Sequence, residues 1–422
     1  MKRLLFSCLA IVFAAVAVNA DSFKLTKPEK VGISSERLEK LDAVMQGFVD
    51  RGELAGMVSL VARKGKIAHF KAYGFQNIED KTPMNEDSLF RIYSMTKPIT
   101  CAALMMLVED GKLFLTDPVS KYLPEFKDMQ VLIGELDGEV KTEPAKSEIT
   151  LQRLAMHTSG IGYGIPENKS PTLSKKHAEI DMFNPANPIK DAISALAEFP
   201  LLHQPGTTWE YGASIDVLAR VIEVVAGQPF GEFLQERMFD PLKMEDAGFS
   251  TPKEDWGRVA TVYTIKEGKI QPAPDSGLPL EKYYKIGVQH AGGHGLMTSA
   301  MDYARFAQML LDGGELEGER VLGPKSIERM STNLIRDEAN NTSWHNDQES
   351  GFGLGVSVKK DQAYSSTLSS LGTYGWSGYA STLFFVDPEE DLIAVFMSQH
   401  VPTNPKQSWQ TYTNLVYQAI VE

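Results

Sequence analysis

Cysteine is scarce in this sequence, and the scarcity limits how the chain can be cross-linked. Only two of the 422 residues are cysteines, Cys8 and Cys101. Cys8 lies in an N-terminal stretch that we expect to be removed, so the remaining chain would have no second cysteine for an internal disulfide. Cys101 falls within a predicted apolar helix and is interpreted as a small core residue. The fold is therefore expected to be stable through its packed core alone.

Several other absences argue against whole classes of function. No long basic patch is present and the formal net charge is -13, so a nucleic-acid partner is not expected. No Gly-rich loop follows a predicted strand, which argues against a nucleotide, and the Gly-x-Ser-x-Gly pattern of α/β-hydrolases is missing. His290 and His294 are four residues apart, but Gly292-Gly293 lies between them, so a helical metal site is not expected. We predict neither a cofactor nor a metal.

Residues 1–20 have the features of an export signal. Lys2-Arg3 forms a short basic start, residues 4–18 are apolar, and small residues at Val18 and Ala20 suit cleavage before Asp21. A membrane anchor is the alternative, but the apolar core is short for one and no second stretch of about 20 apolar residues follows. The sequence predicts a protein that is exported to the periplasm or secreted, with no membrane span in the mature chain.

The order of periodic segments predicts an α+β fold. Strand patterns occur near the start, at 57–63 and 67–73, and near the end, at 355–359, 378–386 and 392–398. Neither group makes a full sheet alone, so we predict one antiparallel sheet, built from both ends and flanked by helices. The predicted domains are an α/β sandwich of residues 21–115 plus 296–422 and an inserted, mainly helical domain of residues 116–295. Residues 161–188 of the insert are long and irregular, which favours a lid-like loop.

The stretch Ser94-Met95-Thr96-Lys97 carries the main chemical signal. It precedes an apolar run at 99–108, and Pro98 fits only in a first helical turn, so a helix is expected to begin close to Ser94. Residues i and i+3 share a helix face, which would put the Ser94 hydroxyl beside the Lys97 amine at the positive end of the helix dipole. A hydroxyl next to a proton acceptor indicates a nucleophile. The same spacing also fits an ordinary capped helix start, so the interpretation depends on other motifs.

Two further stretches supply candidate groups. Tyr211 precedes a predicted helix and would offer a phenol near Lys97, although a structural role is the commoner one for a tyrosine in such a loop. Residues 375–379 bring small side chains to a strand edge, entered at Gly378, where backbone N–H groups can approach a ligand. Other polar residues are weaker candidates: Ser159, Ser214 and Ser377 as nucleophiles, and His157 and His294 as structural or pocket-lining groups.

In their order, these motifs resemble those of the serine β-lactamase and penicillin-binding-protein superfamily, specifically the class C β-lactamase-like esterases (family VIII carboxylesterases). Ser94-Met95-Thr96-Lys97 matches Ser-x-x-Lys, Tyr211-Gly212-Ala213 matches Tyr-x-Asn at its tyrosine, and Trp376-Ser377-Gly378 matches Lys-Thr-Gly at its glycine. Supporting stretches lie at 157–160, 205–207, 292–296 and 386–388. The resemblance covers nearly all of residues 30–400.

The resemblance implies an acyl-enzyme formed on Ser94, with Lys97 and Tyr211 as the general base and the backbone N–H groups of Ser94 and Tyr379 as the oxyanion site. The departures from the family pattern concern the substrate. Trp376 stands where the family has a cationic lysine, and Ala213 stands where it has an asparagine, so both changes remove polar recognition. The side chain of Ser377 is a candidate hydrogen-bonding group for the substrate. The resemblance therefore implies hydrolysis of short- to medium-chain carboxylic esters, with weak or absent β-lactam cleavage.

Two other functions remain open. One is a D-Ala-D-Ala carboxypeptidase, D-aminopeptidase or weak β-lactamase, against which the missing cation at Trp376 argues. The other is a non-catalytic penicillin-binding-like module that binds peptidoglycan or a partner, against which the intact Ser94, Lys97 and Tyr211 argue. The expected partner is a small-molecule ester or acyl compound. The natural ester, acyl transfer to an alcohol or amine, and the oligomeric state do not follow from the sequence.

Overall fold

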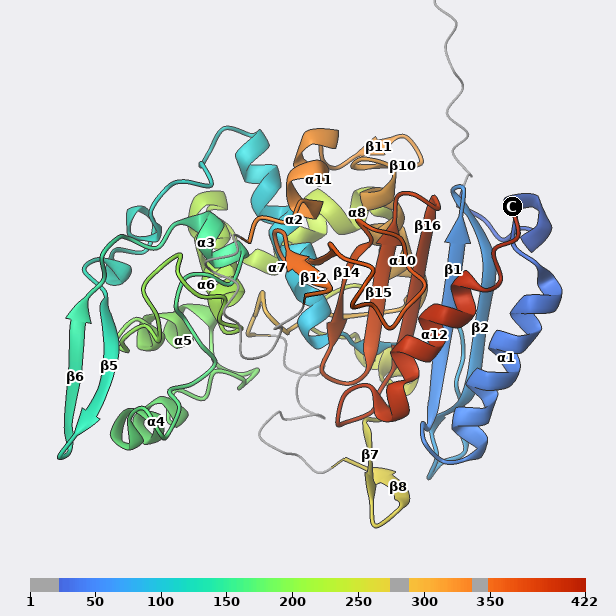
Figure 1. Cartoon of the computed structure of the whole chain (residues 1–422), viewed down its shortest axis with the longest axis horizontal. Helices are drawn as coiled ribbons and strands as arrows, with labels where there is room; N and C mark the ends of the chain where they lie inside the picture. The colour runs from blue at the N-terminus through green and yellow to red at the C-terminus, as the bar shows by residue number, and fades with distance from the viewer. Residues whose placement is uncertain (1–22, 274–287, 336–347) are drawn as a thin grey trace, which may run out of the picture.

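A computed structural model describes residues 23–273, 288–335 and 348–422 of the chain (Figure 1). The predicted export signal, residues 1–20, lies outside the described residues. Within the described residues, no helix combines the length and apolar character that a membrane crossing requires.

One eight-stranded antiparallel sheet organises the fold, and both ends of the chain contribute to it. In sheet order its strands are β12 (Ser350–Phe352), β13 (Ser357–Lys359), β14 (Tyr374–Gly378), β15 (Thr382–Asp387), β16 (Leu392–Ser398), β1 (Gly56–Arg63), β2 (Lys66–Asn77) and β3 (Thr82–Pro83). The first strand pairs with the last, from Met57 opposite Ser398 to Arg63 opposite Leu392. The predicted α+β class, with a large antiparallel sheet assembled from distant segments, is confirmed.

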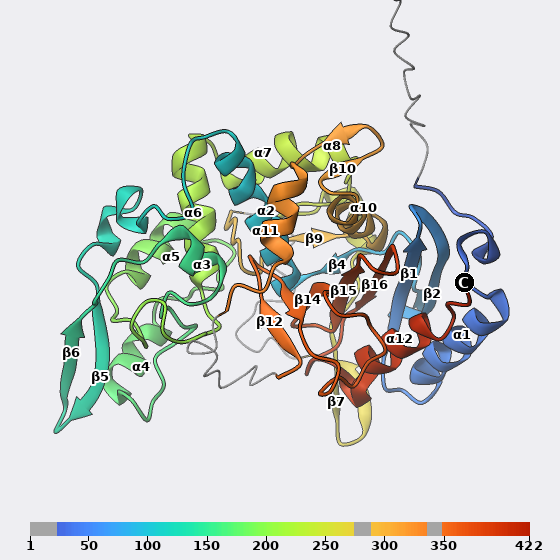
Figure 2. The same ribbon diagram turned by 45° about the horizontal axis from the view of Figure 1, so that its top comes forward.

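Two helical layers cover the two faces of this sheet. On β16, Ala394 and Phe396 belong to the core formed with α1 (Ser35–Asp50) and α12 (Ser408–Tyr417), whereas Val395 and Met397 belong to the larger core that contains α2 (Thr96–Glu109) and α10 (Ala300–Leu311). This division follows from the alternation of side chains along a strand. Figures 1 and 2 show α1 and α12 crossing one face of the sheet and α10 lying behind it.

The middle of the chain holds most of the remaining helices and two hairpins. Among the described residues, the remaining α-helices are α3 (Leu151–Ala155), α4 (Pro171–Ala178), α5 (Ile189–Leu196), α6 (Ser214–Ala226), α7 (Phe230–Leu234), α8 (Asp240–Leu242) and, later in the chain, α11 (Pro324–Ser331). The hairpins are β5 (Gln130–Leu136) with β6 (Glu139–Pro144) and β7 (Tyr263–Lys266) with β8 (Lys269–Pro272). Short two-stranded pairs join β4 (Phe90–Arg91) to β9 (Met297–Thr298) and β10 (Glu315–Leu316) to β11 (Glu319–Arg320). In Figure 1, β5, β6 and α4 project on the side away from the large sheet.

Two details of the sequence-based reading are wrong. The mainly helical pattern expected for 116–295 missed both hairpins, and the segment 378–386 is not one strand. Instead, β14 ends at Gly378 and β15 begins at Thr382, with Ser381 at φ 67° between them. Residues 375–378 therefore lie within β14 and residue 379 follows it, whereas the sequence had predicted that a strand begins at Gly378. The division of the chain into two domains remains a prediction.

Candidate active site

Ser94 sits in a tight turn at the start of α2. The turn is the 3-10 segment η2 (Tyr93–Met95), and α2 follows directly with Pro98 in its first turn. Tyr93 has a φ of 44°, a left-handed conformation that is strained for a bulky residue and is found preferentially at functional sites. Ser94 remains partly exposed, whereas the side chain of Lys97 is fully buried. A reachable hydroxyl thus lies beside an amine shielded from water.

The amine of Lys97 is held by three oxygen atoms. Its Nζ lies 3.1 Å from Ser94 Oγ, 2.9 Å from the hydroxyl of Tyr163 and 2.7 Å from the carbonyl oxygen of Gly293. The i to i+3 spacing brings the first contact within one helical turn, as expected from the sequence. A buried amine that shares a hydrogen bond with a serine hydroxyl is arranged to take the proton of that hydroxyl.

Tyr211 lies against the same amine through its ring. The Lys97 Nζ is 4.6 Å from the centroid of the Tyr211 ring and 5.5 Å from that of Tyr163. Tyr211 lies just before α6, and its ring packs at 5.7 Å from Trp376 and 4.8 Å from His157. The structure therefore brings Ser94, Lys97 and Tyr211 into one neighbourhood.

Tyr163 is a site residue that the sequence analysis missed. It comes from the irregular segment 161–188, which the sequence suggested as a lid, and its phenol oxygen accepts a hydrogen bond from Lys97 Nζ at 2.9 Å. Gly212 packs against this segment so closely that an added Cβ would lie 2.2 Å from the carbonyl oxygen of Ile161. The only sequence signal was the turn at 157–160 followed by an irregular stretch, and neither identifies the tyrosine. The role of segment 161–188 as a lid remains a prediction.

His157 belongs to the aromatic surroundings of the site and is unsuited to act as its base. It is fully buried, with its ring against Trp209, Tyr211 and Phe352. Burial and the nearby charge of Lys97 hold the pKa of His157 well below its usual range. Neither ring nitrogen has a hydrogen-bond partner among the described residues. A neutral imidazole in this position fills space behind Tyr211.

The other candidate histidines and serines are accounted for by packing. Burial lowers the pKa of His294 to about 3, while His290 accepts the Gly231 N–H at 3.1 Å and stacks on Phe249. Within the part of the chain that the structure describes, no cluster of His, Cys, Asp or Glu is arranged to hold a metal ion. The hydroxyls of Ser159 and Ser214 are buried and bonded to each other at 2.8 Å.

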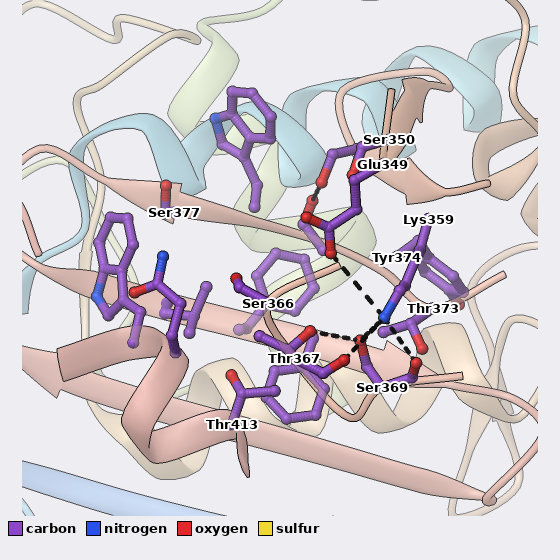
Figure 3. A pocket seen from close by; sticks show the side chains of 18 residues that line it. Glu349, Ser350, Lys359, Ser366, Thr367, Ser369, Thr373, Tyr374, Ser377 and Thr413 are labelled. Carbon is purple, nitrogen blue, oxygen red and sulfur yellow. Dashed lines mark hydrogen bonds and ion pairs between the residues drawn. The ribbon is translucent and has the colours of Figure 1, made fainter. Parts of the chain in front are cut away.

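The strand β14 presents its residues to two different sides. Trp376 is nearly buried and packs against Tyr211 and Phe352 in the larger core. Ser377 lines a cavity of about 410 Å³ on the side of the sheet covered by α12, and Trp376 is also among the residues that line this cavity (Figure 3). The alternation of side chains along the strand turns the Trp376 indole toward Tyr211 and the Ser377 side chain toward the opposite face.

Gly378 ends β14 close to the segment that leads to Ser94. An added Cβ there would lie 2.4 Å from the carbonyl oxygen of Ile92 and 2.2 Å from the hydroxyl of Thr382, which explains the glycine. The ring of Tyr379, the next residue, packs edge-on at 5.7 Å from that of Tyr93. Ala213 is buried at the N-cap of α6. The backbone of residues 378–379 therefore lies beside the turn that carries Ser94.

Comparisons with known proteins agree with this architecture. The family described as Beta-lactamase matches residues 41–417. An uncharacterized protein of Mycobacterium tuberculosis is 36% identical over 375 residues, which span 86% of this chain and 90% of that protein. Esterase EstB of Burkholderia gladioli is 30% identical over 361 residues, 82% of this chain and 86% of EstB. The solved structure of EstCE1, described as a hydrolase with promiscuous acyltransferase activity, has a TM-score of 0.75 at 25% identity and covers 92% of this chain and 98% of its own. These likenesses support a serine hydrolase of the β-lactamase fold.

Proposed function

The chain belongs to the Beta-lactamase family, and we propose that within it the protein is a carboxylic ester hydrolase that acts through an acyl-enzyme on Ser94. The observation that carries the proposal is the contact of 3.1 Å between the Lys97 amine and the Ser94 hydroxyl, next to the rings of two tyrosines. Its substrates are neutral esters of short to medium chain length, and the protein acts after export to the periplasm or the exterior.

Acylation begins when Ser94 Oγ attacks the carbonyl carbon of the ester. The hydroxyl proton passes to Lys97, whose amine lies next to the ring of Tyr211, and the carbonyl oxygen becomes an oxyanion. The backbone N–H groups of Ser94 and Tyr379 donate to that oxyanion. Collapse of the tetrahedral intermediate breaks the bond to the alcohol, which leaves with the proton returned by Lys97 and Tyr211. The acyl group remains on Ser94.

Deacylation repeats the same steps with water as the nucleophile. Lys97 and Tyr211 accept a proton from the water as it attacks the acyl carbon, and the second tetrahedral intermediate collapses to release the carboxylic acid. Ser94 recovers its proton and the cycle closes. An alcohol that replaces the water in this step yields a new ester, which is the type of reaction named for EstCE1.

The preference for neutral esters rests on Trp376. This residue occupies the position of the cationic lysine in Lys-Thr-Gly, and its indole packs against Tyr211 and Phe352. An indole supplies apolar area and no positive charge, so it gives no attraction to the carboxylate of a β-lactam or of a peptide terminus. Esterase activity is also what the name of EstB states for that relative.

The proposal is tested with p-nitrophenyl esters of increasing acyl length beside a chromogenic cephalosporin. We expect ester turnover to exceed cephalosporin turnover by at least about a hundredfold, and a fluorophosphonate to label wild-type protein but not Ser94→Ala. The control is Ser120→Ala, since the Ser120 hydroxyl contacts Glu148 at the surface. Faster cephalosporin turnover would favour the peptidase or β-lactamase alternative. Absence of labelling would favour the non-catalytic module.

A further inference from the structure

A carboxyl group outside the proposed catalytic trio holds the main-chain acceptor of Lys97. Asp216 lies in the first turn of α6 and is fully buried. Its Oδ1 accepts the Gly293 N–H at 2.8 Å, and the carbonyl oxygen of the same glycine accepts the Lys97 amine at 2.7 Å. We infer that Asp216 is a positioning residue, which acts through Gly293 to orient the amine of Lys97 toward Ser94. This inference rests on the proposed role of Lys97 as proton acceptor.

The position of Gly293 is fixed from two helices. An added Cβ at Gly293 would lie 2.3 Å from Asp216 Oδ2, so the carboxylate packs directly on the glycine. On the other side, the carbonyl oxygen of Gly292 accepts the Thr100 hydroxyl at 2.8 Å, and the Leu296 N–H donates to the Thr96 hydroxyl at 3.1 Å. The loop of residues 292–296 is therefore bound to α6 by Asp216 and to α2 by Thr96 and Thr100. Asp216 and Thr100 hold the 292–293 peptide group, which adjoins the Gly293 carbonyl that accepts from Lys97.

A fixed carbonyl constrains what the amine can do. A carbonyl oxygen only accepts hydrogen bonds, so the 2.7 Å contact with Gly293 uses one N–H of Lys97. The neutral amine then has one N–H and one lone pair left, and the groups that face the amine include the hydroxyls of Ser94 and Tyr163 and the ring of Tyr211. The lone pair can therefore be directed at Ser94 with the N–H at Tyr163. Loss of the anchor would let the amine turn its lone pair elsewhere.

The charge of Asp216 acts in the same direction. Burial raises the pKa of Asp216 to about 6, while the nearby Lys97 and the Gly293 N–H oppose this rise. Above that pH the carboxylate is charged and stabilises the ammonium that forms when Lys97 takes the proton of Ser94. The other titratable groups around the pair include the phenols of Tyr163 and Tyr211, the imidazoles of His157 and His294 and the thiol of Cys101. Nε2 of His294 lies 3.8 Å from Asp216 Oδ1, and both imidazoles have lowered pKa values.

The chain contains a matched carboxylate for comparison. Asp302 lies in the first turn of α10, is also buried, and its Oδ2 accepts the Asp246 N–H at 2.7 Å. Its pKa is likewise raised, to about 7, by burial. The two residues thus share their position in a first helical turn, their burial and a hydrogen bond from a backbone N–H. They differ in what that backbone contacts: Gly293, which Asp216 binds, accepts from Lys97, whereas Asp246, which Asp302 binds, does not contact Lys97.

The test uses Asp216→Asn, Asp216→Ala and Asp302→Asn in the full chain. The readouts are the rate at which a fluorophosphonate labels Ser94 between pH 5 and 9, and kcat and KM for p-nitrophenyl butyrate. We expect Asp216→Ala to lower the labelling rate and kcat by about a hundredfold with KM within about threefold. Asp216→Asn keeps an acceptor for the Gly293 N–H but not the negative charge. Its labelling rate and kcat should therefore fall by about tenfold, and its labelling rate should lack the change near pH 6. Asp302→Asn should match wild type within about twofold.

The outcomes separate this inference from the proposed function. Rates and pH profiles for Asp216→Asn that match those of Asp302→Asn would overturn the inference, as would a loss explained entirely by a smaller folded fraction in thermal melts. A wild-type protein that is labelled on Ser94 but cleaves no ester would refute the esterase proposal, and the labelling series would still decide the role of Asp216. A wild-type protein that is not labelled on Ser94 would overturn both.

Discussion

The backbones of Gly212 and Gly162 touch, and an added Cβ on Gly212 would lie only 2.5 Å from the Cα of Gly162. Each glycine adjoins a tyrosine, and the rings of Tyr211 and Tyr163 lie with their centroids 5.5 Å apart, both within 5.5 Å of the Lys97 amine. The two phenols are therefore brought to one amine by a main-chain contact between segments that carry no side chain at the point of closest approach.

Replacing Gly212 with alanine should disrupt this contact. The new Cβ would meet main-chain atoms of residues 161 and 162, which cannot move aside as a flexible side chain would. We expect Gly212→Ala to lower kcat by at least about tenfold and the free energy of unfolding by about 1–3 kcal/mol. Gly164→Ala is the control, since an added Cβ there has nothing within 4 Å. Steady-state kinetics and chemical denaturation measure both, and equal behaviour of the two variants would contradict the role of the contact.

Removing only the hydroxyl of Tyr163 should affect catalysis more than stability. Tyr163→Phe loses the 2.9 Å bond to Lys97 but keeps the ring contacts with Phe183 and Tyr211. We expect kcat for p-nitrophenyl butyrate to fall by about tenfold and the unfolding free energy to change by about 1 kcal/mol. Tyr122→Phe, which removes a phenol bonded to Asp117, is the control for the chemical change. Unchanged kcat in Tyr163→Phe would show that this hydroxyl takes no part.

The indole of Trp376 should contribute to both stability and substrate binding. Trp376→Ala leaves a cavity beside Tyr211 and Phe352, which should reduce the unfolding free energy by about 3–5 kcal/mol and raise KM for apolar esters. Trp376→Phe retains an apolar ring, so its unfolding free energy should fall less and its KM should rise less than in Trp376→Ala. Trp409→Ala, in α12 on the other face of the sheet, should be destabilised with KM unchanged. An equal rise of KM in Trp409→Ala would rule out a specific role for Trp376.

Asp302 should make stability depend on pH. Burial raises its pKa from the ordinary 3.8 to about 7, so the folded state holds a proton that the unfolded state releases between these values. The contribution of Asp302 to the free energy of unfolding therefore falls as pH rises from about 4 to about 7, and it is constant above pH 7. Asp302→Asn should match wild type near pH 4.5 and be more stable at pH 8, by at most about 4 kcal/mol. Urea denaturation at the two pH values measures this. If the unfolding free energies of Asp302→Asn and wild type differ by the same amount at both pH values, the prediction is contradicted.

The sheet was predictable because its strands are apolar and its first turn carries a clear signal. Lys64-Gly65 joins β1 to β2 with both residues at positive φ, as a tight hairpin turn requires. The break between β14 and β15 was missed because Tyr379-Ala380-Ser381 contains no Gly, Pro, Asn or Asp, and its serine alone is a weak turn signal. The hairpin of β5 and β6 was missed although Asp137-Gly138 offered a turn signal, because the apolar residues around it were read with helical spacing.

The site was predictable where its contacts are local. Ser94 and Lys97 are three residues apart, so helix geometry alone places the hydroxyl beside the amine. The contacts of Lys97 with Tyr163 and Gly293 join residues that are 66 and 196 positions apart. No periodicity or motif in one sequence encodes such distances, and Asp216 looked like any acidic residue in a first helical turn. These partners follow from tertiary packing.

The pairing of β1 with β16 has a consequence for how the protein is made. Ser398 donates a hydrogen bond to Gly56, 342 positions earlier in the chain. During synthesis, the centre of the sheet must wait until nearly the whole polypeptide has left the ribosome, and contacts of such long range slow folding. Until then β1 exposes an unpaired edge, which is a template for aggregation. Chains truncated before residue 392 should accumulate as insoluble material even though they retain Ser94, Lys97 and Tyr211.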